Sequence, residues 1–592
     1  MADESEVVAS ILRHRSDPTQ LLQILREAQE ELGWISPQTA HAIATGVDVP
    51  ITRVESVVQF YSFLYDAPHG RYRILFSDNI TDRMLGSLTL FEHMLKRLKL
   101  SRGEVSPDGA VSVDLTSCTG MCDQGPAALV NTRAITRLTA RRVDEICDLV
   151  RGGIPVAEWP ADYFHIEENI RRGDALLGSR YEPGSALRAA IAFGRQGMLD
   201  EMKHSNLRGR GGAGFTTSVK WEGCRNAPGA ERFVVCNADE GEPGTFKDRV
   251  LLTSYAERVL EGMAIAGFVV GAARGLLYLR GEYRHLLEPL QAKLEAMRRG
   301  RFLGASICGA QGFDFDIDIH LGAGAYICGE ESALIESLEG KPGKPRIRPP
   351  FPVTVGYLGK PTVVNNVETL AQTTEIALSG GRAFAWRGTK GSAGTKILSV
   401  SGDCARPGLY EYPFGVRVEQ VLKDCGASAV AAVQISGPSG VCLTPDEFRR
   451  HIAFEDVPTA GAFMVFGKDR DLFEVARNFT HFFAHESCGF CTPCRVGTVL
   501  MRDALDKIAD GRGSRYEINE LMRLSELLRR TSHCGLGQTA GNPVRDTWLK
   551  FRPAYERRLI RGEFDPAVDL DAALARAREI AGREDAAAHI GA

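Results

Sequence analysis

The chain has 592 residues, 44% of them hydrophobic and 25% charged, so it is long enough to form several globular domains. Its formal net charge of −4 argues against nucleic-acid binding, and its acidic start, MADESE, is neither a secretory signal nor a basic transit peptide. The longest uncharged apolar run, Gly262 to Ala273, is too short to span a bilayer, and fourteen cysteines, mostly scattered, suit a reducing compartment, so we expect a cytoplasmic protein without direct membrane contact.

The first 150 residues are expected to form one domain with a helical and a mixed portion. Residues 6–66 show helical periodicity, and Ser36-Pro37 is typical of the start of a helix. Residues 71–150 mix strand and helix patterns, and the polar stretch with prolines at residues 151–184 is interpreted as a linker. The apolar face expected for one early helix consists of Leu21, Leu22, Ile24 and Leu25.

The next region, residues 185–387, alternates strand and helix patterns as in a parallel α/β sheet, and contains a glycine-rich loop, LRGRGGAGF. The loop satisfies the letters G-x-G-x-x-G, but the preceding MLDEMKHSNL reads as a helix, whereas a conventional Rossmann dinucleotide site requires a strand there. Glycines let the backbone approach a ligand, and N–H groups that open a helix favour anions, so a nucleotide phosphate fits; a flexible surface loop is the alternative. The glycines are Gly209, Gly211, Gly212 and Gly214.

Later segments favour a ligand site. An apolar strand ending at Cys236 runs into Asn237, Asp239, Glu240 and Glu242, and polar groups at the end of a strand can orient a ligand, although a solvated acidic turn would look similar locally. Two more blocks follow, GAGAYICGEESALIESLEGKPGKPRIRPPFP and VVNNVETL. Together, these motifs resemble the flavin-binding, NADH-oxidising subunit of respiratory complex I over residues 207–543.

This resemblance implies that FMN and NAD(H) bind here. The loop would wrap FMN, while Phe215 and Phe351 match positions that stack on the adenine of NADH. Glu242 and Glu331 match positions facing the riboses, where a carboxylate repels a 2′-phosphate, so NAD is expected over NADP. Arg348 suits the pyrophosphate. The residues expected to surround the flavin are Arg210 and the loop glycines, with Lys220, Asn237, Asp239, Tyr326, Gly329, Glu330, Asn365 and Asn366.

Hydride transfer to a flavin needs no side-chain acid or base, because the cofactor carries the chemistry. Glu242 and Glu330 are therefore expected to act at the catalytic site as electrostatic and positioning groups. One position departs from the family pattern: Gly223 falls where some relatives have an aromatic residue that adds to the adenine stack.

A second motif lies near the C-terminus. Residues 388–469 suggest a small β-grasp domain, and helical periodicity dominates residues 470–592. Within the helical part, three cysteines at intervals of three and one distant cysteine give a pattern typical of a [4Fe–4S] cluster, which also resembles the cluster site of the same subunit. Zinc sites usually have two separated cysteine pairs, and unligated buried thiols are the other alternative. The expected ligands are Cys488, Cys491, Cys494 and Cys534.

Residues 1–150 resemble the thioredoxin-like partner subunit of the same dehydrogenase, fused here to the flavin subunit. Cys118-x-x-x-Cys122-Asp-Gln-Gly-Pro matches the second half of its [2Fe–2S] motif, but Ser77 and Asp82 stand where the first half places cysteines. Because two thiolates make a poor iron–sulfur site, we expect a degenerate domain without this cluster. The alternative is that oxygen ligands or a partner's residues complete it.

The expected fold class is multidomain α/β: a helical plus thioredoxin-like N-terminal domain, a Rossmann-like FMN-binding α/β domain, a small β-grasp (ubiquitin-like) domain, and a C-terminal helical bundle holding a [4Fe–4S] cluster. The fusion resembles the diaphorase flavin subunit of soluble NAD-reducing [NiFe] hydrogenase. That resemblance implies electron transfer between NAD(H), FMN and the cluster, then to an iron–sulfur subunit carrying onward clusters and through it to a [NiFe] hydrogenase dimer. Alternatives are the flavin subunit of a molybdenum-containing NAD-dependent formate dehydrogenase or of complex I, and a non-catalytic assembly scaffold.

Two other patterns have simpler interpretations. The alternating run from Phe313 to His320 places three aspartates on one face, which a half-solvated strand explains better than a cation site. His481 and His485, spaced i and i+4, lack the order of a metalloprotease motif. His533, beside Cys534, either tunes the cluster or is a surface residue.

Overall fold

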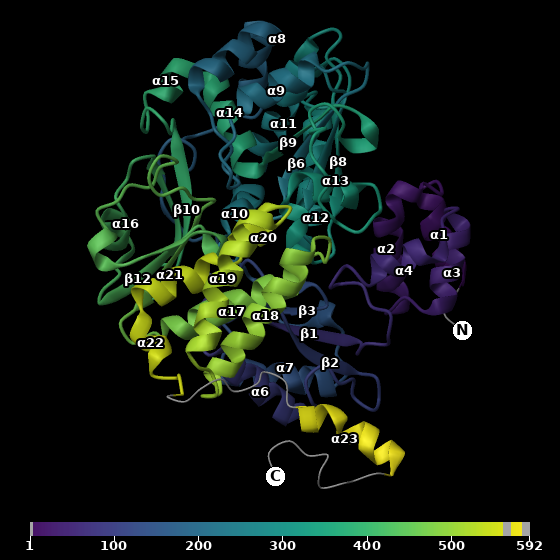
Figure 1. Cartoon of the computed structure of the whole chain (residues 1–592). Coiled ribbons are helices and arrows are strands. Elements are labelled where there is room, and N and C mark those ends of the chain that lie inside the picture. The colour runs from purple at the N-terminus through teal and green to yellow at the C-terminus, as the bar shows by residue number, and fades with distance from the viewer. Residues whose placement is uncertain (1–3, 561–569, 583–592) are drawn as a thin grey trace.

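The computed structural model describes residues 4–560 and 570–582. The four helices at the start of the chain form a lobe at the right of Figure 1. The predicted apolar face of α2 is buried, and Ser36 caps α3 by accepting from the backbone N–H of Thr39 at 3.0 Å. These helices share one hydrophobic core with Phe233 and Val235 of the central sheet, so they cover a face of that sheet. The helices are α1 (Glu4–Arg13), α2 (Leu21–Leu32), α3 (Pro37–Gly46) and α4 (Ile51–Val58).

The thioredoxin-like portion has its own core and a four-stranded sheet in the order β2-β1-β3-β4. Strands β1 and β2 are parallel, whereas β3 is antiparallel to both β1 and β4. The predicted first domain therefore contains two separate cores. Its elements are β1 (Tyr72–Ser77), α5 (Ile80–Met84), α6 (Ser87–Leu98), β2 (Val111–Thr116), β3 (Ala128–Val130), β4 (Arg133–Ile135) and α7 (Ala140–Arg151).

The stretch interpreted as a linker is anchored along its length. Strand β5 (Ile170–Arg172) pairs in parallel with β11 (Gly408–Pro413) at the edge of the largest sheet. The backbone N–H groups of Leu176 and Leu177 donate to the Glu411 carboxylate at 2.8 to 3.1 Å. Proline and polar composition alone did not reveal this edge strand, because its pairing partner lies more than two hundred residues away in the chain.

The central domain has the parallel sheet that the sequence predicts, in the order β8-β7-β6-β9. Side chains alternate along β6: Val234 and Cys236 face the helices of the main core, while Phe233 and Val235 face the N-terminal helices. The elements are α8 (Ser185–Ser205), α9 (Thr217–Asn226), β6 (Phe233–Ala238), α10 (Lys247–Ser254), α11 (Ala256–Val270), β7 (Arg274–Leu279), α12 (Leu287–Arg299), β8 (Asp316–Leu321), α13 (Glu331–Leu338), β9 (Thr362–Asn366), α14 (Val367–Ser379) and α15 (Gly381–Ala385).

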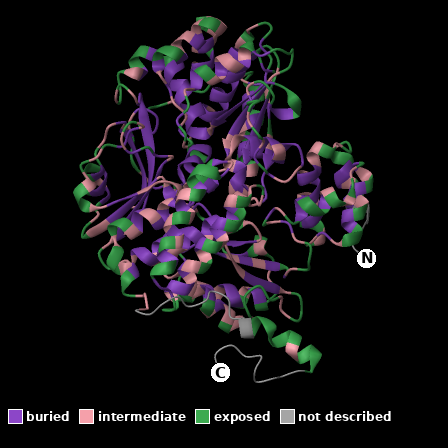
Figure 2. Cartoon of the chain, viewed as in Figure 1, coloured by how far each residue is buried: buried purple, intermediate pink, exposed green. Residues whose placement is uncertain are grey.

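A six-stranded sheet follows, in the order β13-β12-β14-β10-β11-β5, with β10 and β14 parallel at its centre. Helix α16 packs on this sheet, and the strands of both large sheets are mostly buried (Figure 2). The remaining elements here are β10 (Thr395–Gly402), α16 (Val418–Cys425), β12 (Val430–Ile435), β13 (Val441–Leu443) and β14 (Ala462–Gly467).

Helices make up the rest of the described chain, as predicted. Helices α17 to α22 form a bundle that packs against the six-stranded sheet and against Ile327 and Ala333, and the exposed α23 lies apart from it (Figures 1 and 2). Among the described helices, none combines the length and apolar composition needed to cross a bilayer. The bounds are α17 (Leu472–Glu486), α18 (Thr492–Ala509), α19 (Arg515–Thr531), α20 (Gly535–Thr539), α21 (Asn542–Lys550), α22 (Arg552–Glu556) and α23 (Leu570–Ala581).

Candidate functional site

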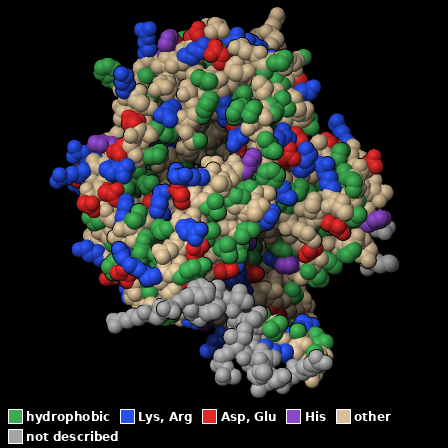
Figure 3. All heavy atoms as spheres, in the orientation of Figure 1, with side chains coloured by type: hydrophobic (Ala, Val, Ile, Leu, Met, Phe, Trp, Pro, Cys, Tyr) green, Lys and Arg blue, Asp and Glu red, His purple; other side chains and the backbone are tan. Residues whose placement is uncertain are grey.

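The glycine loop joins α8 to α9, so a helix precedes it, as the sequence predicts. Hydrogen bonds of 2.9 Å from Gly209 N to the Phe215 carbonyl and from Thr217 N to the Leu207 carbonyl close the loop. Gly212 has φ 139°, and a Cβ placed there would meet no heavy atom within 4 Å. At Gly212 the loop therefore presents bare backbone toward open space, which suits a bound ligand. Figure 3 shows the molecule hollowed above the centre of the view, beside the place where Figure 1 draws α14, β9 and α10.

Arg210 lies within this loop, but its side chain points into the protein. The guanidinium is fully buried and donates to the carbonyl oxygens of Arg208 at 3.0 Å and Ala393 at 2.7 Å. It also lies over the ring of Phe414, and burial lowers its pKa to about 10. The expectation that Arg210 surrounds the flavin therefore applies to its backbone, whereas its side chain anchors the loop to the start of the six-stranded sheet.

Two asparagines end neighbouring parallel strands. Asn237 and Asn366 are register partners at the carboxyl ends of β6 and β9. Asn237 Nδ2 donates to the Gly329 carbonyl at 2.7 Å, and a Cβ built on Gly211 would lie 3.0 Å from that of Asn366, so the strand ends and the glycine loop meet. Asn365 is turned the other way, because its Oδ1 accepts from the indole N–H of Trp221 at 2.9 Å.

Asp239 lies next to this meeting point. Its Oδ2 is buried without a hydrogen-bond partner, and burial raises the carboxyl pKa well above its usual range. A Cβ on Gly329 would lie 3.3 Å from the Asp239 backbone oxygen, so a side chain larger than glycine would crowd this position. An unsatisfied buried oxygen costs about 1 to 3 kcal/mol. The residues present therefore fit FMN, whose hydroxyl groups could satisfy this oxygen.

Four of the predicted charged residues come together. Lys220 Nζ donates to Glu331 Oε2 at 2.6 Å, and Arg348 lies 3.2 Å from Glu330 and 3.5 Å from Glu331. Glu330 also caps α13 by accepting from the N–H groups of Ser332 and Ala333, both at 3.0 Å. The cluster supplies two cations of fixed position, as binding of a nucleotide phosphate requires.

Glu242 belongs to a second polar group. Its carboxylate accepts from the Tyr326 hydroxyl, and from both the backbone N–H and the hydroxyl of Ser439 at 2.9 and 2.7 Å. Burial raises the Glu242 pKa. Ser439 was missed by the sequence analysis, since it lies between β12 and β13, almost two hundred residues away, and no motif marks it.

Two aromatic side chains remain at the surface of this site. Phe215 is 57% exposed and Phe351 is 53% exposed, which is unusual for phenylalanine and suits the predicted stacking on an adenine. At Gly223, an added Cβ would meet only Val353 at 3.7 Å or more, so the backbone there accepts a side chain without a clash at Cβ.

The sequence analysis also missed a buried charge network beneath the glycine loop. Lys247 Nζ donates to Asp248 at 2.6 Å and lies 3.2 Å from Glu368, which also pairs with Lys396. Lys396 Nζ reaches the Arg210 carbonyl at 3.4 Å, and burial lowers the Lys396 pKa to about 7. Glu368 lies in the VVNNVETL block, but only burial distinguishes it from a solvated acid.

The four predicted cysteine ligands line one cavity of about 260 Å³. Cys491 and Cys534 are the residues just before α18 and α20, so two helix starts face this space. Among the described residues, no group of three or more His, Cys, Asp or Glu side chains converges closely enough to hold a single metal ion. Four thiols around one cavity are the ligand set that a [4Fe–4S] cluster needs. His533 also lines the cavity, although its Nε2 contacts the Arg346 carbonyl at 3.0 Å.

One short helix, η6 (Tyr326–Gly329), separates the two sites. Tyr326 and Gly329 contact Glu242 and Asn237, whereas Ile327 lines the cysteine cavity. The Tyr326 ring also packs against Phe482 of α17, with 5.0 Å between ring centroids. The predicted flavin site and the predicted cluster site are thus neighbours across a single turn of chain.

Comparisons with known proteins agree with this arrangement. Three family descriptions match: a Nuo51 FMN-binding domain over residues 202–375, a thioredoxin-like [2Fe-2S] ferredoxin over 7–151, and an NADH-ubiquinone oxidoreductase-F iron-sulfur binding region over 474–558. The NAD-reducing hydrogenase HoxS subunit alpha of Cupriavidus necator is 41% identical, over 96% of this chain and 97% of that protein. The chain belongs to the family of this alpha subunit.

Other relatives support the same membership. A crystal structure of NAD⁺-reducing [NiFe]-hydrogenase in the H₂-reduced state contains a chain with 42% identity and a TM-score of 0.90, and the match covers 98% of this chain and 99% of that one. The NADP-reducing hydrogenase subunit HndC of Solidesulfovibrio fructosivorans is 42% identical over 61% of this chain and 75% of its own length. The match to an alpha subunit along nearly the whole chain confirms the predicted multidomain fold.

The two residues that stand where the [2Fe–2S] motif places its first cysteines, Ser77 and Asp82, are already engaged in hydrogen bonds within the protein. Ser77 donates to Asp82 Oδ2 at 2.7 Å, and Asp82 Oδ1 accepts from the Ala127 N–H at 2.9 Å. Asp82 is buried, which raises its pKa well above the usual range. Only Cys118 and Cys122 supply thiols, so these residues do not fit a cluster that needs four ligands.

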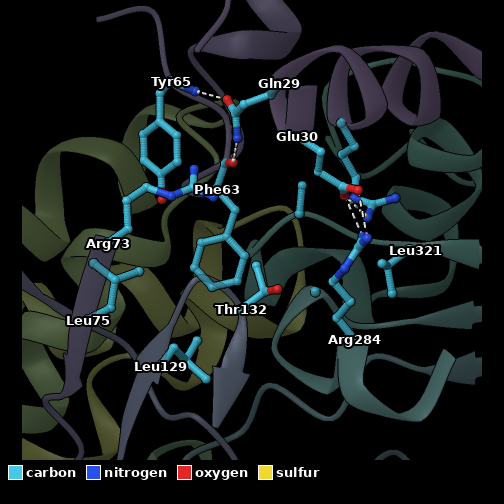
Figure 4. Close-up of a pocket in the computed structure, with 14 residues that line it drawn as sticks. Gln29, Glu30, Phe63, Tyr65, Arg73, Leu75, Leu129, Thr132, Arg284 and Leu321 are labelled. Carbon is cyan, nitrogen blue, oxygen red and sulfur yellow. Dashed lines mark hydrogen bonds and ion pairs between the residues drawn. The ribbon is translucent and has the colours of Figure 1, made fainter. Parts of the chain in front are cut away.

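A separate cavity of about 560 Å³ lies where the N-terminal helices, the thioredoxin-like sheet and the central domain meet (Figure 4). Gln29 bridges its upper side, donating to the Phe63 carbonyl at 2.6 Å and accepting from Tyr65 N at 2.7 Å. Arg284 makes a two-pronged ion pair with Glu30. Arg73 lies over the Tyr65 ring, and the lining residues come from three parts of the chain, so the cavity is interpreted as a junction between domains.

Asp316, Asp318 and His481 form ordinary ion pairs in the structure. The aspartates before and within β8 lie at the surface, where Asp318 pairs with Arg274 and Asp316 with Arg298, both at 3.0 Å. His481 contacts Asp506 at 2.8 Å. The interpretation of the aspartates as one face of a half-solvated strand therefore agrees with the structure.

Proposed function

We propose that the chain is the NAD(H)-oxidising or NAD⁺-reducing diaphorase subunit of a multisubunit NAD-reducing hydrogenase. It would bind FMN and NAD(H) at the glycine loop and a [4Fe–4S] cluster at the four cysteines. When bound, FMN exchanges a hydride with the nicotinamide and exchanges electrons singly with the cluster.

The observation that best supports this function is the position of η6. Tyr326 and Gly329 of η6 contact residues of the proposed flavin site, and Ile327 of η6 lines the cysteine cavity. The two proposed redox sites are therefore separated only by this short helix. A non-catalytic scaffold would have no need for a buried, unsatisfied Asp239 oxygen beside a bare glycine loop. Closely spaced redox sites are what stepwise electron transfer requires.

The chain's own residues would bind and orient both molecules. The backbone N–H groups of the loop and Lys220 would hold the FMN phosphate, while Asn237, Asp239 and Asn366 would hold its polar side chain and ring edge. Phe215 and Phe351 would stack on adenine. Glu242, held by Tyr326 and Ser439, would accept from ribose hydroxyls and repel a 2′-phosphate, which favours NAD over NADP.

The partners follow from the same proposal. Electrons would leave the cluster for an iron–sulfur subunit and reach a [NiFe] hydrogenase dimer, as the names of the similar hydrogenase proteins suggest. All fourteen cysteines are free, which favours a reducing compartment such as the cytoplasm. The thioredoxin-like portion would pack against partner subunits without a [2Fe–2S] cluster.

The test is anaerobic NADH titration of the purified chain containing FMN. The flavin absorbance should bleach with NADH and respond much less to NADPH. Bound iron and acid-labile sulfide should be lost when Cys491 is replaced by serine. A chain that retains FMN but is not reduced by NADH would support the scaffold instead. Copurified nickel identifies a hydrogenase complex, and copurified molybdenum would overturn that assignment in favour of formate dehydrogenase.

A further inference from the structure

Cys118 and Cys122 lie in contact in the loop between β2 and β3. Their sulfur atoms are 3.3 Å apart, and both residues are buried. Asn79 Nδ2 donates to both sulfurs, at 3.3 and 2.9 Å, and the Gly120 N–H donates to Cys118 at 3.4 Å. A disulfide has an S–S length of about 2.05 Å, so a small movement of the side chains would join the pair.

The surrounding contacts favour a negatively charged sulfur at Cys118. The contact between the two thiols lowers the pKa of Cys118 and raises that of Cys122, and the nearby Arg280 guanidinium also lowers the pKa of Cys118. The thiolate is the nucleophile in disulfide exchange. Cys118 therefore has the character of the attacking thiol, and Cys122 that of the thiol that reacts second.

An open cleft reaches this pair. It encloses about 1060 Å³ of space, part of it open to solvent, between the thioredoxin-like portion and helices α17 and α18. Cys118 lines the cleft, and Cys122 is not among its lining residues. Because Cys118 lines the cleft but is only 1% exposed, a small molecule would approach the pair from the Cys118 side and reach its sulfur when the lining moves.

The lining of the cleft favours an anionic molecule. Arg83 and Arg102 each use Nε to pair with a carboxylate, Asp78 and Asp114 respectively, at 2.6 Å. Among the described residues, the Nη groups of these two arginines make no hydrogen bond, so they can still donate to a ligand carboxylate. Arg502 also lines the cleft but is engaged by Asp503 at 2.8 Å.

We propose that Cys118 and Cys122 form a reversible thiol/disulfide pair, oxidised through this cleft by an anionic low-molecular-weight disulfide. The Cys118 thiolate attacks one sulfur of the disulfide, forming a mixed disulfide and releasing one thiolate. Cys122 loses its proton and attacks the Cys118 sulfur, forming the Cys118–Cys122 bond and releasing the second thiol. The protein pair gives two electrons to the small disulfide, which leaves as two thiols.

The test treats the reduced, FMN-loaded chain with oxidised glutathione and maps the products by peptide mass spectrometry. The expected product is a Cys118–Cys122 link with the loss of two hydrogens, reversed by a reducing thiol. Cys122→Ser should instead trap glutathione on Cys118. Cys224→Ser, which removes a buried cysteine elsewhere, is the matched control and should still form the link.

The charge of the reactant is tested separately. Cystamine, a cationic disulfide, should react about tenfold more slowly, because steering by charge changes encounter rates by at least about tenfold. The double variant Arg83→Gln and Arg102→Gln should slow glutathione about tenfold and speed cystamine, because the lining that attracts an anion repels a cation. Equal rates for both reagents would overturn the anionic specificity.

Iron analysis decides between this pair and a cluster. Cys118→Ser should leave bound iron and sulfide unchanged, and the unoxidised chain should bleach with NADH as before. Loss of iron in that variant would overturn the proposal, as would failure to find the Cys118–Cys122 link. Because flavin bleaching is measured independently, failure of the thiol pair is distinguishable from failure of the proposed function.

Discussion

Gly223 stands where the family pattern has an aromatic residue in some members, so its replacement tests the predicted stacking on adenine. Replacement by phenylalanine should strengthen NADH binding, because a Cβ at this position meets only Val353 at 3.7 Å or more and ring stacking contributes about 0.5 to 1.5 kcal/mol. The KM for NADH should fall about two- to tenfold, with FMN content unchanged. Gly223→Ala removes the helix-propensity effect of glycine without adding a ring, and should leave KM unaltered. An equal fall in KM for both variants would contradict the stacking explanation.

Arg210 shows how a motif residue can act through the backbone. Arg210→Met should remove two buried hydrogen bonds that hold the glycine loop, each worth about 1.5 to 3 kcal/mol for a charged donor. We expect FMN affinity to fall at least tenfold in direct titration of flavin-free protein. Arg225→Met, which removes an exposed contact to Gln196, is the control. Unchanged FMN affinity in Arg210→Met would show that the loop holds its shape without this anchor.

For single residues, the sequence predicted which residues lie near the glycine loop, but it could not predict the direction of each side chain. The structure places Asn237, Asn366 and the loop glycines together, while their contact with a flavin stays a prediction. They could not show that Asn365 turns toward Trp221, because adjacent residues of a strand point to opposite faces and the letters alone do not say which face binds. Ser439 was missed because its partner, Glu242, is distant in the chain.

Strand β8 illustrates the limit at the scale of an element. Its alternation predicts one solvated face, and Asp318 is exposed there, but His320 at the end of that face is buried. Alternation in the sequence does not show that His320 is covered, and the charged groups of His14 and Asp17 lie close enough to His320 to influence its pKa. A local pattern cannot report which distant segment covers it.

His320 therefore predicts a pH dependence. Burial lowers its pKa from 6.5 to about 4, so the unfolded chain binds a proton more readily than the folded chain. Its contribution to stability is present above pH 6.5 and is lost as the pH falls through 4, a change of about 3 kcal/mol. Chemical denaturation at pH 7 and pH 4 should show that His320→Asn loses less free energy of unfolding on acidification than the unaltered chain. If both proteins lost the same free energy of unfolding between pH 7 and pH 4, groups other than His320 would account for the pH dependence.

Across the whole molecule, the predicted domains are less independent than the sequence suggested. The N-terminal helices share a core with the flavin-domain sheet, and the predicted linker gives an edge strand to the six-stranded sheet. Periodicity found the apolar face of α2 correctly, but it could not identify the surface that this face covers. The fusion to a flavin domain is thus a packing relationship as well as a covalent one.

Because of this shared core, a substitution at Leu25, far from the glycine loop, should weaken the retention of FMN. Leu25 is completely buried between α2 and the rest of that core, so Leu25→Ala should cost about 2 to 5 kcal/mol. Because the sheet that carries Asn237 and Asn366 belongs to the same core, heating should release FMN from this variant at a lower temperature, in step with loss of helical signal. Leu12→Ala, at a position 67% exposed, should do neither. If Leu25→Ala unfolded the N-terminal helices at a temperature where FMN stayed bound, the two parts would be separate folding units.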